Sequence, residues 1–239
     1  MKIYASDFIN PGVINIFSDA SMWPQVNNSM IGCYGFISMQ EKRELNSGVY
    51  LDSNTTVNKC EIKGVKYAVF EAIRLRQQGF TGIINIFCDS QVSILGIREW
   101  IFKWTVDNSV LMNNSGNEVA NQSEFIQIMQ LIIKYNPNIN FYHQKGHVEL
   151  HDNKKLSRAI RVFISSNFPN SRYEDIDVNF IKYISMCNNE IDNRTRWFLR
   201  NQSDAQNRIY SDPFKFVPTD NYESELHYYN LITGGRYNV

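Results

Sequence analysis

The chain has 239 residues, enough for one large domain or for one domain with an appendage. Lysine plus arginine equals aspartate plus glutamate at 24 each, which excludes a globally basic nucleic-acid binder and leaves only local attraction for phosphate. A hydrophobic content of 43% predicts a buried core, and no apolar run is long enough to span a membrane. The first residues show no secretory signal pattern and the four cysteines show no metal-ligand spacing, so we expect a cytoplasmic protein with reduced thiols.

The first part of the chain predicts four strands and one long helix. Segments rich in β-branched and aromatic residues predict strands over 13–17 and 31–39 and a shorter one over 47–51, with a Pro/Asn-rich turn at 23–28. Apolar residues at helical spacing predict a helix over 61–78, which Gly79 ends. A continuous apolar run over 83–88 is typical of a central strand in a mixed sheet.

The second part of the chain is mostly helical. Helices are predicted over 91–104 and 123–135, on either side of a polar stretch around 113–117, and the last strand over 139–144. Three further helices are predicted over 153–165, 178–187 and 189–200. The tail after residue 201 has no clear period.

Three acidic residues stand beside these elements where they can meet. Asp19 follows the first strand, Glu61 opens the long helix, and Asp89 follows the central strand. Taken singly, they suit a turn, a helix dipole and a helix cap. Taken together, carboxylates at strand ends and at a helix start can converge on one sheet edge. Such a cluster repels itself unless cations hold it together, so the pattern predicts Mg²⁺ or a similar hard ion.

Five motifs in order resemble those of the ribonuclease HI family. They are the strand aspartate Asp19, Thr-x-Asn-x-x-Glu over 56–61, Asp-Ser-Gln over 89–91, Lys-Gly-His over 145–147 and Asn-x-x-x-Asp over 188–192. The resemblance implies an α/β fold, a mixed five-stranded sheet with its first three strands antiparallel and helices on both faces. It assigns residues 1–200 to this domain, with a helical insertion at about 148–187 before the last helix, and leaves 201–239 as a C-terminal extension of unknown role.

The resemblance also implies an activity. The chain is expected to be an endoribonuclease that hydrolyses the RNA strand of RNA–DNA hybrids with two Mg²⁺ ions, for which Mn²⁺ can substitute, and that leaves 5′-phosphate and 3′-hydroxyl ends. Asp19 would bridge both ions, whereas Glu61 and Asp89 would bind mainly one. Two alternatives stay open: a DNA-cleaving nuclease of the same superfamily, and a catalytically inactive protein that binds nucleic acid or a partner.

The fourth carboxylate is ambiguous in the sequence. The short loop that is usual in the family after His147 leads to Asn153-Lys154-Lys155-Leu156-Ser157, and a serine is a poor ligand for a hard cation. Asn188 to Asp192 restores the carboxylate but requires an insertion of about 35 residues. We prefer Asp192, early in a helix, and regard Asp152 and Asp177 as weaker candidates.

The remaining site predictions concern proton transfer and substrate binding. The resemblance gives His147 a role in proton handling or product release, and gives Asn58 and Gln91 contacts with the minor groove of the hybrid, to which Ser90 would add a hydroxyl contact. The segment 93–135 resembles the handle, a region that many members of the family make basic to bind the duplex. Here it is net acidic by one charge. We therefore predict that a denser basic helix face binds phosphate instead, made of Lys154, Lys155, Arg158 and Arg161.

Overall fold

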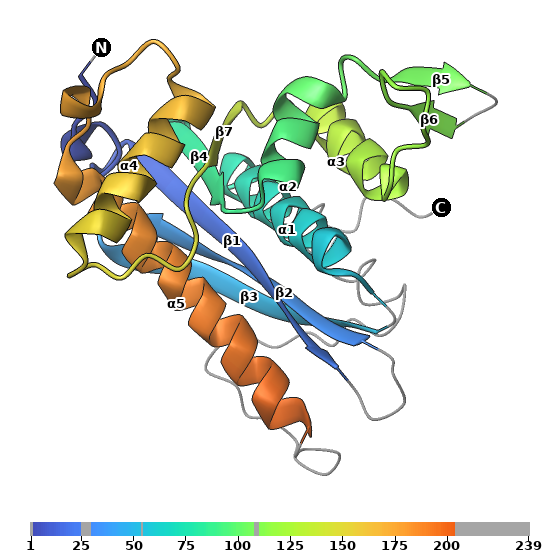
Figure 1. The fold of residues 1–239 in the computed structure, drawn as a ribbon, viewed down its shortest axis with the longest axis horizontal. Coiled ribbons are helices and arrows are strands. Elements are labelled where there is room, and N and C mark those ends of the chain that lie inside the picture. The colour runs from blue at the N-terminus through green and yellow to red at the C-terminus, as the bar shows by residue number, and fades with distance from the viewer. Residues whose placement is uncertain (1, 25–29, 54, 108–109, 204–239) are drawn as a thin grey trace.

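A mixed five-stranded sheet forms the centre of the molecule. The computed structural model describes residues 2–24, 30–53, 55–107 and 110–203. The strand order is β3-β2-β1-β4-β7 (Figure 1). β1 (Val13–Pro24), β2 (Met30–Gln40) and β3 (Arg43–Ser53) are antiparallel, whereas β4 (Ile83–Cys88) and β7 (Ile139–His143) continue parallel to β1. The predicted fold class is thereby confirmed.

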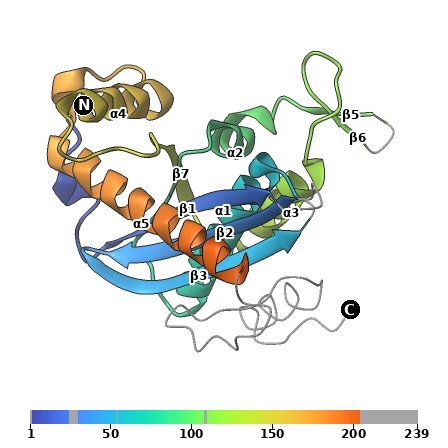
Figure 2. The ribbon, with the colours of Figure 1, turned by 60° about the horizontal axis from the view of Figure 1, so that its bottom comes forward.

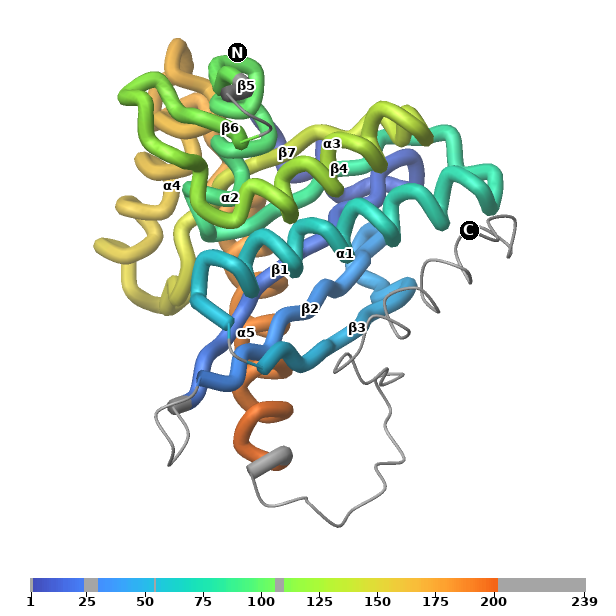
Figure 3. The backbone as a smooth tube through the Cα atoms, turned by 90° about the vertical axis from the view of Figure 1, so that its right-hand side faces the viewer, coloured from blue at the N-terminus to red at the C-terminus, as the bar shows by residue number. Residues whose placement is uncertain are grey.

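Helices cover both faces of this sheet because its strands alternate apolar side chains between two cores. Ile16 packs in one core with α1 (Val57–Gln77) and α3 (Gln122–Tyr135), while the next residue, Phe17, packs in the other. That second core includes residues of α4 (Asn153–Asn167) and α5 (Val178–Ser203). Figure 2 shows α5 crossing the sheet, and Figure 3 shows α1 and α3 side by side on the other face.

Between β4 and α3 the chain departs from the single helix predicted over 91–104. α2 (Gln91–Leu95) passes into a π-helical turn, η2 (Gly96–Trp100), in which the Ile101 amide donates to the Gly96 carbonyl at 3.0 Å. The helical path then ends, and β5 (Thr105–Asp107) and β6 (Val110–Met112) form a small hairpin that was not predicted. Two 3₁₀ turns complete the described elements, η1 (Ala5–Asp7) and η3 (Tyr173–Asp175).

Several predicted boundaries were wrong, for local reasons. β1 extends seven residues beyond the predicted end at 17, to Pro24, and α1 begins at Val57 because the Thr56 hydroxyl caps it by accepting from the Lys59 amide at 3.3 Å. The helices predicted over 178–187 and 189–200 form one continuous α5. Asn188 and Asn189 do not break it, since their side chains bond to Gln144 and to the Val148 carbonyl instead of to nearby backbone.

The predicted insertion, about 148–187, contains α4, η3 and the first turns of α5. Of the predicted C-terminal extension, 201–239, residues 204–239 lie outside the described part of the chain. Within the described part, no helix combines the length and the apolar character needed to cross a membrane.

Candidate active site

The parallel pairing of β1 and β4 brings two aspartates together. Ser18 pairs with Cys88 at the end of β4, so Asp19 and Asp89, one residue further along each strand, lie side by side. Asp19 is therefore in the middle of β1 rather than at its end. One oxygen of Asp19, Oδ1, accepts from the Ala20 amide at 2.7 Å, and Oδ2 is buried without a hydrogen-bond partner. An orphaned, buried carboxylate oxygen is a free ligand for a cation.

Glu61 joins this pair from the second turn of α1. It is not the first helical residue, as the sequence suggested, so a favourable helix dipole does not explain it. Its Oε2 accepts from the Cys88 thiol, with 3.7 Å between oxygen and sulfur. Ligand atoms of Glu61, Cys88 and Asp89 all lie within 4.8 Å of one another, close enough to share one ion.

Asp192 completes a group of four carboxylates from the middle of α5, not from the beginning of a helix as predicted. Its Oδ1 pairs with Arg196 Nε at 2.7 Å and its Oδ2 with His147 Nδ1 at 3.3 Å. All four acidic residues and His147 line one cleft of about 410 Å³. The long α5 thus supplies the carboxylate that the short-loop alignment lacks.

The three other candidates for the fourth position have separate structural contacts. Ser157 lies on α4 and shares a hydrogen bond with the Tyr173 hydroxyl at 3.2 Å. Asp152 caps α4 by accepting from the Lys154 and Lys155 amides. Asp177 accepts from the amides of Ala5 and Asn179. None of these three residues lines the acidic cleft.

Burial and mutual repulsion make the cluster costly to ionise. Burial raises the pKa of the Asp19 carboxyl well above its ordinary value, and the Asp89, Glu61 and Asp192 carboxyls raise it further. Burial likewise raises the pKa of Glu61, with Asp89 raising it further. The pKa of Asp89 is also raised by burial, although His147, Asn188 and Lys145 act to lower it. A hard divalent cation suits this donor set, because it would supply the missing positive charge.

The predicted Lys-Gly-His segment passes directly against Asp89. A Cβ on Gly146 would lie 1.8 Å from Asp89 Oδ2, so only glycine allows this approach. The next residue, His147, has a positive φ of 52°, and 59% of its side chain is exposed. This backbone places the imidazole on the rim of the cleft, beside Asp192.

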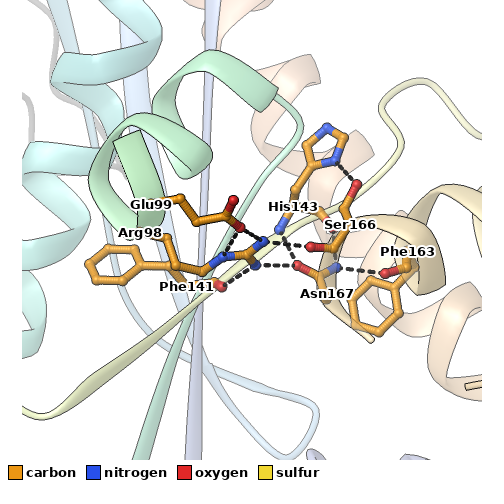
Figure 4. A network of polar contacts seen from close by, with 7 residues as sticks. All are labelled: Arg98, Glu99, Phe141, His143, Phe163, Ser166 and Asn167. Atoms are coloured by element: carbon orange, nitrogen blue, oxygen red, sulfur yellow. Dashed lines mark hydrogen bonds and ion pairs between the residues drawn. The ribbon is translucent and has the colours of Figure 1, made fainter. Parts of the chain in front are cut away.

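A second histidine, His143, contacts the backbone of Asp89 and was not predicted as a site residue. Figure 4 shows its ring bonded to the Ser166 hydroxyl at 2.9 Å; the other ring nitrogen lies 3.1 Å from the Asp89 carbonyl oxygen. Asn167 pairs with both the backbone amide and the carbonyl of His143, at 3.0 and 2.7 Å. Arg98 donates to Asn167 Oδ1 and to the Ser166 carbonyl. The end of α4 is thereby tied to β7, η2 and the Asp89 backbone.

The predicted substrate-binding residues fall into two groups. Asn58 and Gln91 are exposed in the first turns of α1 and α2, and Ser90 caps α2 by accepting from the Ser93 amide at 3.3 Å. The basic residues form an exposed surface of α4, which we call the basic α4 face: Lys154, Lys155, Arg158 and Arg161. A shallow surface hollow includes three of them, along with Asn153 and Ser157.

Comparison with known proteins agrees with the family resemblance. The family model for RNase H matches residues 11–161. The ribonuclease HI of Pasteurella multocida is 31% identical over 134 residues, covering 56% of this chain and 78% of that protein. The ribonuclease HI of Haemophilus influenzae strain Rd is 30% identical over 146 residues, covering 60% and 84%.

A solved structure shares the fold. A foamy viral protease-reverse transcriptase in complex with an RNA/DNA hybrid superposes with a TM-score of 0.50 and 14% identity over 71% of this chain. The match spans about a fifth of the viral protein, 21% of its length. Because the family match ends at residue 161, the place of Asp192 in the cleft rests on geometry rather than on the alignment.

Proposed function

Because this chain belongs to the ribonuclease H family, we propose that it is an endoribonuclease that hydrolyses the RNA strand of RNA–DNA hybrids. The observation that carries the proposal is the convergence of four carboxylates on one cleft: Asp19, Glu61, Asp89 and Asp192. The proposed products carry 5′-phosphate and 3′-hydroxyl ends.

The four carboxylates would hold two Mg²⁺ ions, or Mn²⁺ in their place, which when bound activate the attacking water and stabilise the leaving oxygen. Asp19 would contact both ions, because it lines the cleft with the other three carboxylates and its Oδ2 has no partner. Glu61 and Asp89, whose ligand atoms lie within 4.8 Å of each other, would contribute mainly to one ion. Asp192 would complete the other.

His147 is placed to exchange protons between the cleft and solvent. Its ring is largely exposed, and its Nδ1 lies 3.3 Å from Asp192 Oδ2. An imidazole ring can both accept and donate a proton, so His147 can take up or release one during turnover. We assign it to proton handling or product release rather than to metal binding.

Substrate binding would combine a minor-groove contact with a phosphate contact. Asn58, Ser90 and Gln91 offer amide and hydroxyl groups, which can both donate to and accept from 2′-hydroxyls and base edges. The basic α4 face would bind the backbone phosphates. Arg98, in the handle segment 93–135, pairs with Glu99 at 2.6 Å and hydrogen-bonds to Asn167 at the end of α4. It therefore adds little positive charge for binding phosphate there, which favours the basic α4 face for that role.

The observations support the two rival functions less than they support hydrolysis of an RNA–DNA hybrid. A catalytically inactive binding protein does not need four carboxylates in one cleft, of which the buried Asp19 and Glu61 are costly to ionise without a cation. A DNA-cutting nuclease remains the closer rival within the superfamily. The amide groups of Asn58 and Gln91 and the Lys-Gly-His motif favour the RNA strand of a hybrid as the target.

Cleavage assays separate these functions. Labelled RNA–DNA hybrid, duplex DNA and duplex RNA are incubated with the purified protein in Mg²⁺, Mn²⁺ or chelator. We expect cleavage of the RNA strand in the hybrid alone, and only with metal. The variant Asp19→Asn, purified in parallel, controls for contaminating nucleases and should be inactive. Cleavage of duplex DNA, or equal activity in Asp19→Asn, would refute the proposal.

A further inference from the structure

Cys88 places a sulfur atom beside the proposed catalytic carboxylates. It is the last residue of β4, fully buried on the α1 side of the sheet, and its thiol donates to Glu61 Oε2 across 3.7 Å. Two ligands of one tetrahedral Zn²⁺, an oxygen at about 2.1 Å and a sulfur at about 2.3 Å, are roughly 3.6 Å apart. The sulfur and the carboxylate oxygen are therefore already spaced as two ligands of one ion.

The surrounding groups complete a ligand set. Asp89 contributes an oxygen within 4.8 Å of both of these atoms. Asp19 is only 3% exposed and lines the same cleft, and its Oδ2 has no hydrogen-bond partner. Two carboxylates and one thiol thus lie close enough to share one ion, and a third carboxylate of the cleft, that of Asp19, has a buried oxygen without a partner.

We propose that Cys88 makes this cleft a binding site for a thiol-preferring divalent cation such as Zn²⁺ or Cd²⁺, held by the Cys88 sulfur with Glu61 and Asp89. The inference rests on the proposed function in one respect: both place a cation among the same carboxylates. Mg²⁺ binds oxygen ligands, whereas softer cations gain from sulfur. On binding, the thiol proton leaves to solvent and the cation takes its place between sulfur and Glu61. Such an ion excludes Mg²⁺ from the shared carboxylates and acts as an inhibitor.

The other three cysteines provide matched controls. All are buried, but within the described residues none of them forms such a group with two carboxylates. Cys60 shares a hydrogen bond with the Thr55 hydroxyl at 3.4 Å. Cys187 lies in the second core on α5. A signal that depends on Cys88 and not on Cys187 therefore reports the cleft.

The experiment titrates metal-free, reduced protein with Cd²⁺ alone and records the ultraviolet absorbance of sulfur-to-cadmium charge transfer. We expect a band that saturates at one ion per chain, is lost in Cys88→Ser and is retained in Cys187→Ser. Loss of even an outer-shell partner costs about 10–100-fold in metal affinity, so Glu61→Gln should weaken Cd²⁺ binding by at least about 100-fold. Circular dichroism of each variant verifies folding, and Cys88→Ala provides a second replacement.

Two results would overturn the inference. One is the absence of a charge-transfer band in the wild type, and the other is a band in Cys88→Ser and Cys88→Ala as strong as that of the wild type. If calorimetry shows Cd²⁺ binding without the band, carboxylates alone hold the ion and Cys88 has no part. The proposed nuclease function is tested separately. Absence of hybrid cleavage in Mg²⁺ would refute that function while leaving a Cys88-dependent band intact.

Discussion

Asp192 reaches the cleft from the middle of α5, where Arg196 and His147 each contact one of its oxygens. Replacement by asparagine keeps the shape and removes the charge that an ion needs. We expect Asp192→Asn to lower kcat for hybrid cleavage by at least about 100-fold, since loss of a mere outer-shell partner costs about 10–100-fold in affinity or activity. Raising Mn²⁺ should restore part of the activity, because weaker binding is offset by concentration.

Ser157→Ala is the matched test of the rejected alignment. Ser157 lies on α4 outside the acidic cleft, and alanine suits a helix. Activity should stay near wild type, and stability should change by less than about 0.5 kcal/mol. Both variants are assayed across one metal titration. An inactive Ser157→Ala together with a normal Asp192→Asn would mean that the second metal site is built differently.

Gly146 controls the position of Asp89. A methyl group at this residue would lie 1.8 Å from Asp89 Oδ2, so Gly146→Ala must displace the carboxylate or the loop. We expect a loss of about 10–100-fold in metal affinity or activity, as for other disturbances around metal ligands. Gly12→Ala serves as control, since its Cβ would meet only the end of the Asn10 side chain, at 3.2 Å. Equal activity of the two variants would show that Asp89 tolerates the displacement.

At the scale of elements, α4 has an exposed basic face and a terminus that joins the site. Reversing its four basic residues to glutamate should weaken hybrid binding and reduce the slope of log affinity against log salt by up to about four, because fewer counterions are released. The control reverses four other exposed basic residues, which changes the net charge equally: Lys2, Lys42, Arg43 and Lys182. If both variants lose the same affinity and slope, net charge explains the effect and the basic α4 face is only solvated.

The last residue of α4, Asn167, hydrogen-bonds to the edge strand β7 with its side chain. Asn167 accepts from the His143 amide and donates to its carbonyl, which is the bonding pattern of a neighbouring strand on the edge of β7. Asn167→Leu leaves both backbone groups unpaired, so we expect a loss of about 1–3 kcal/mol in the free energy of unfolding. Urea denaturation measures this loss, with Asn201→Ala near the end of α5 as control. Equal stability of the two variants would mean that water replaces Asn167 without cost.

At the scale of the whole molecule, the sequence predicted the sheet better than the helix boundaries. The strand over 83–88 matched β4 because an apolar run, interrupted only by Asn85, ends there at polar residues. The break in α5 was predicted wrongly because Asn188 looks like a helix-ending residue until its tertiary partner Gln144 is known. The π-helical turn after α2 and the β5–β6 hairpin had no periodic signal.

The candidate site shows the same limit. Motif order sufficed to nominate Asp19, Glu61 and Asp89, although Asp19 lies in the middle of β1 and Glu61 in the second turn of α1 rather than at the element ends that hydrophobic periodicity suggested. The choice between Ser157 and Asp192 required the path of the chain between β7 and α5, which spacing does not give. His143 and Cys88 could not be found from the sequence, because their contacts join residues far apart in the chain.

The acidic cleft should also make the stability of the metal-free protein depend on pH. The pKa values of Asp19, Glu61 and Asp89 are raised in the folded state above ordinary values of 3.8 for aspartate and 4.5 for glutamate. The folded protein therefore holds these protons to higher pH than the unfolded chain does. Stability from these groups is fully present below the ordinary values and is lost as pH rises through the raised ones. The loss is about 1.4 kcal/mol for each pH unit that separates the folded and unfolded pKa values of a group.

The variant Asp19→Asn isolates this effect because it removes one charge from the cluster and relieves its neighbours. In chelator, the variant should be more stable than wild type at neutral pH, and the difference should shrink as pH falls towards 4. Mg²⁺ at neutral pH should stabilise wild type by about 2.7 kcal/mol when its concentration is 100 times the dissociation constant. It should stabilise the variant less. Urea denaturation over a pH series, with and without Mg²⁺, measures all three quantities. A stability difference that is constant with pH would show that the buried carboxylates do not repel one another in the metal-free protein.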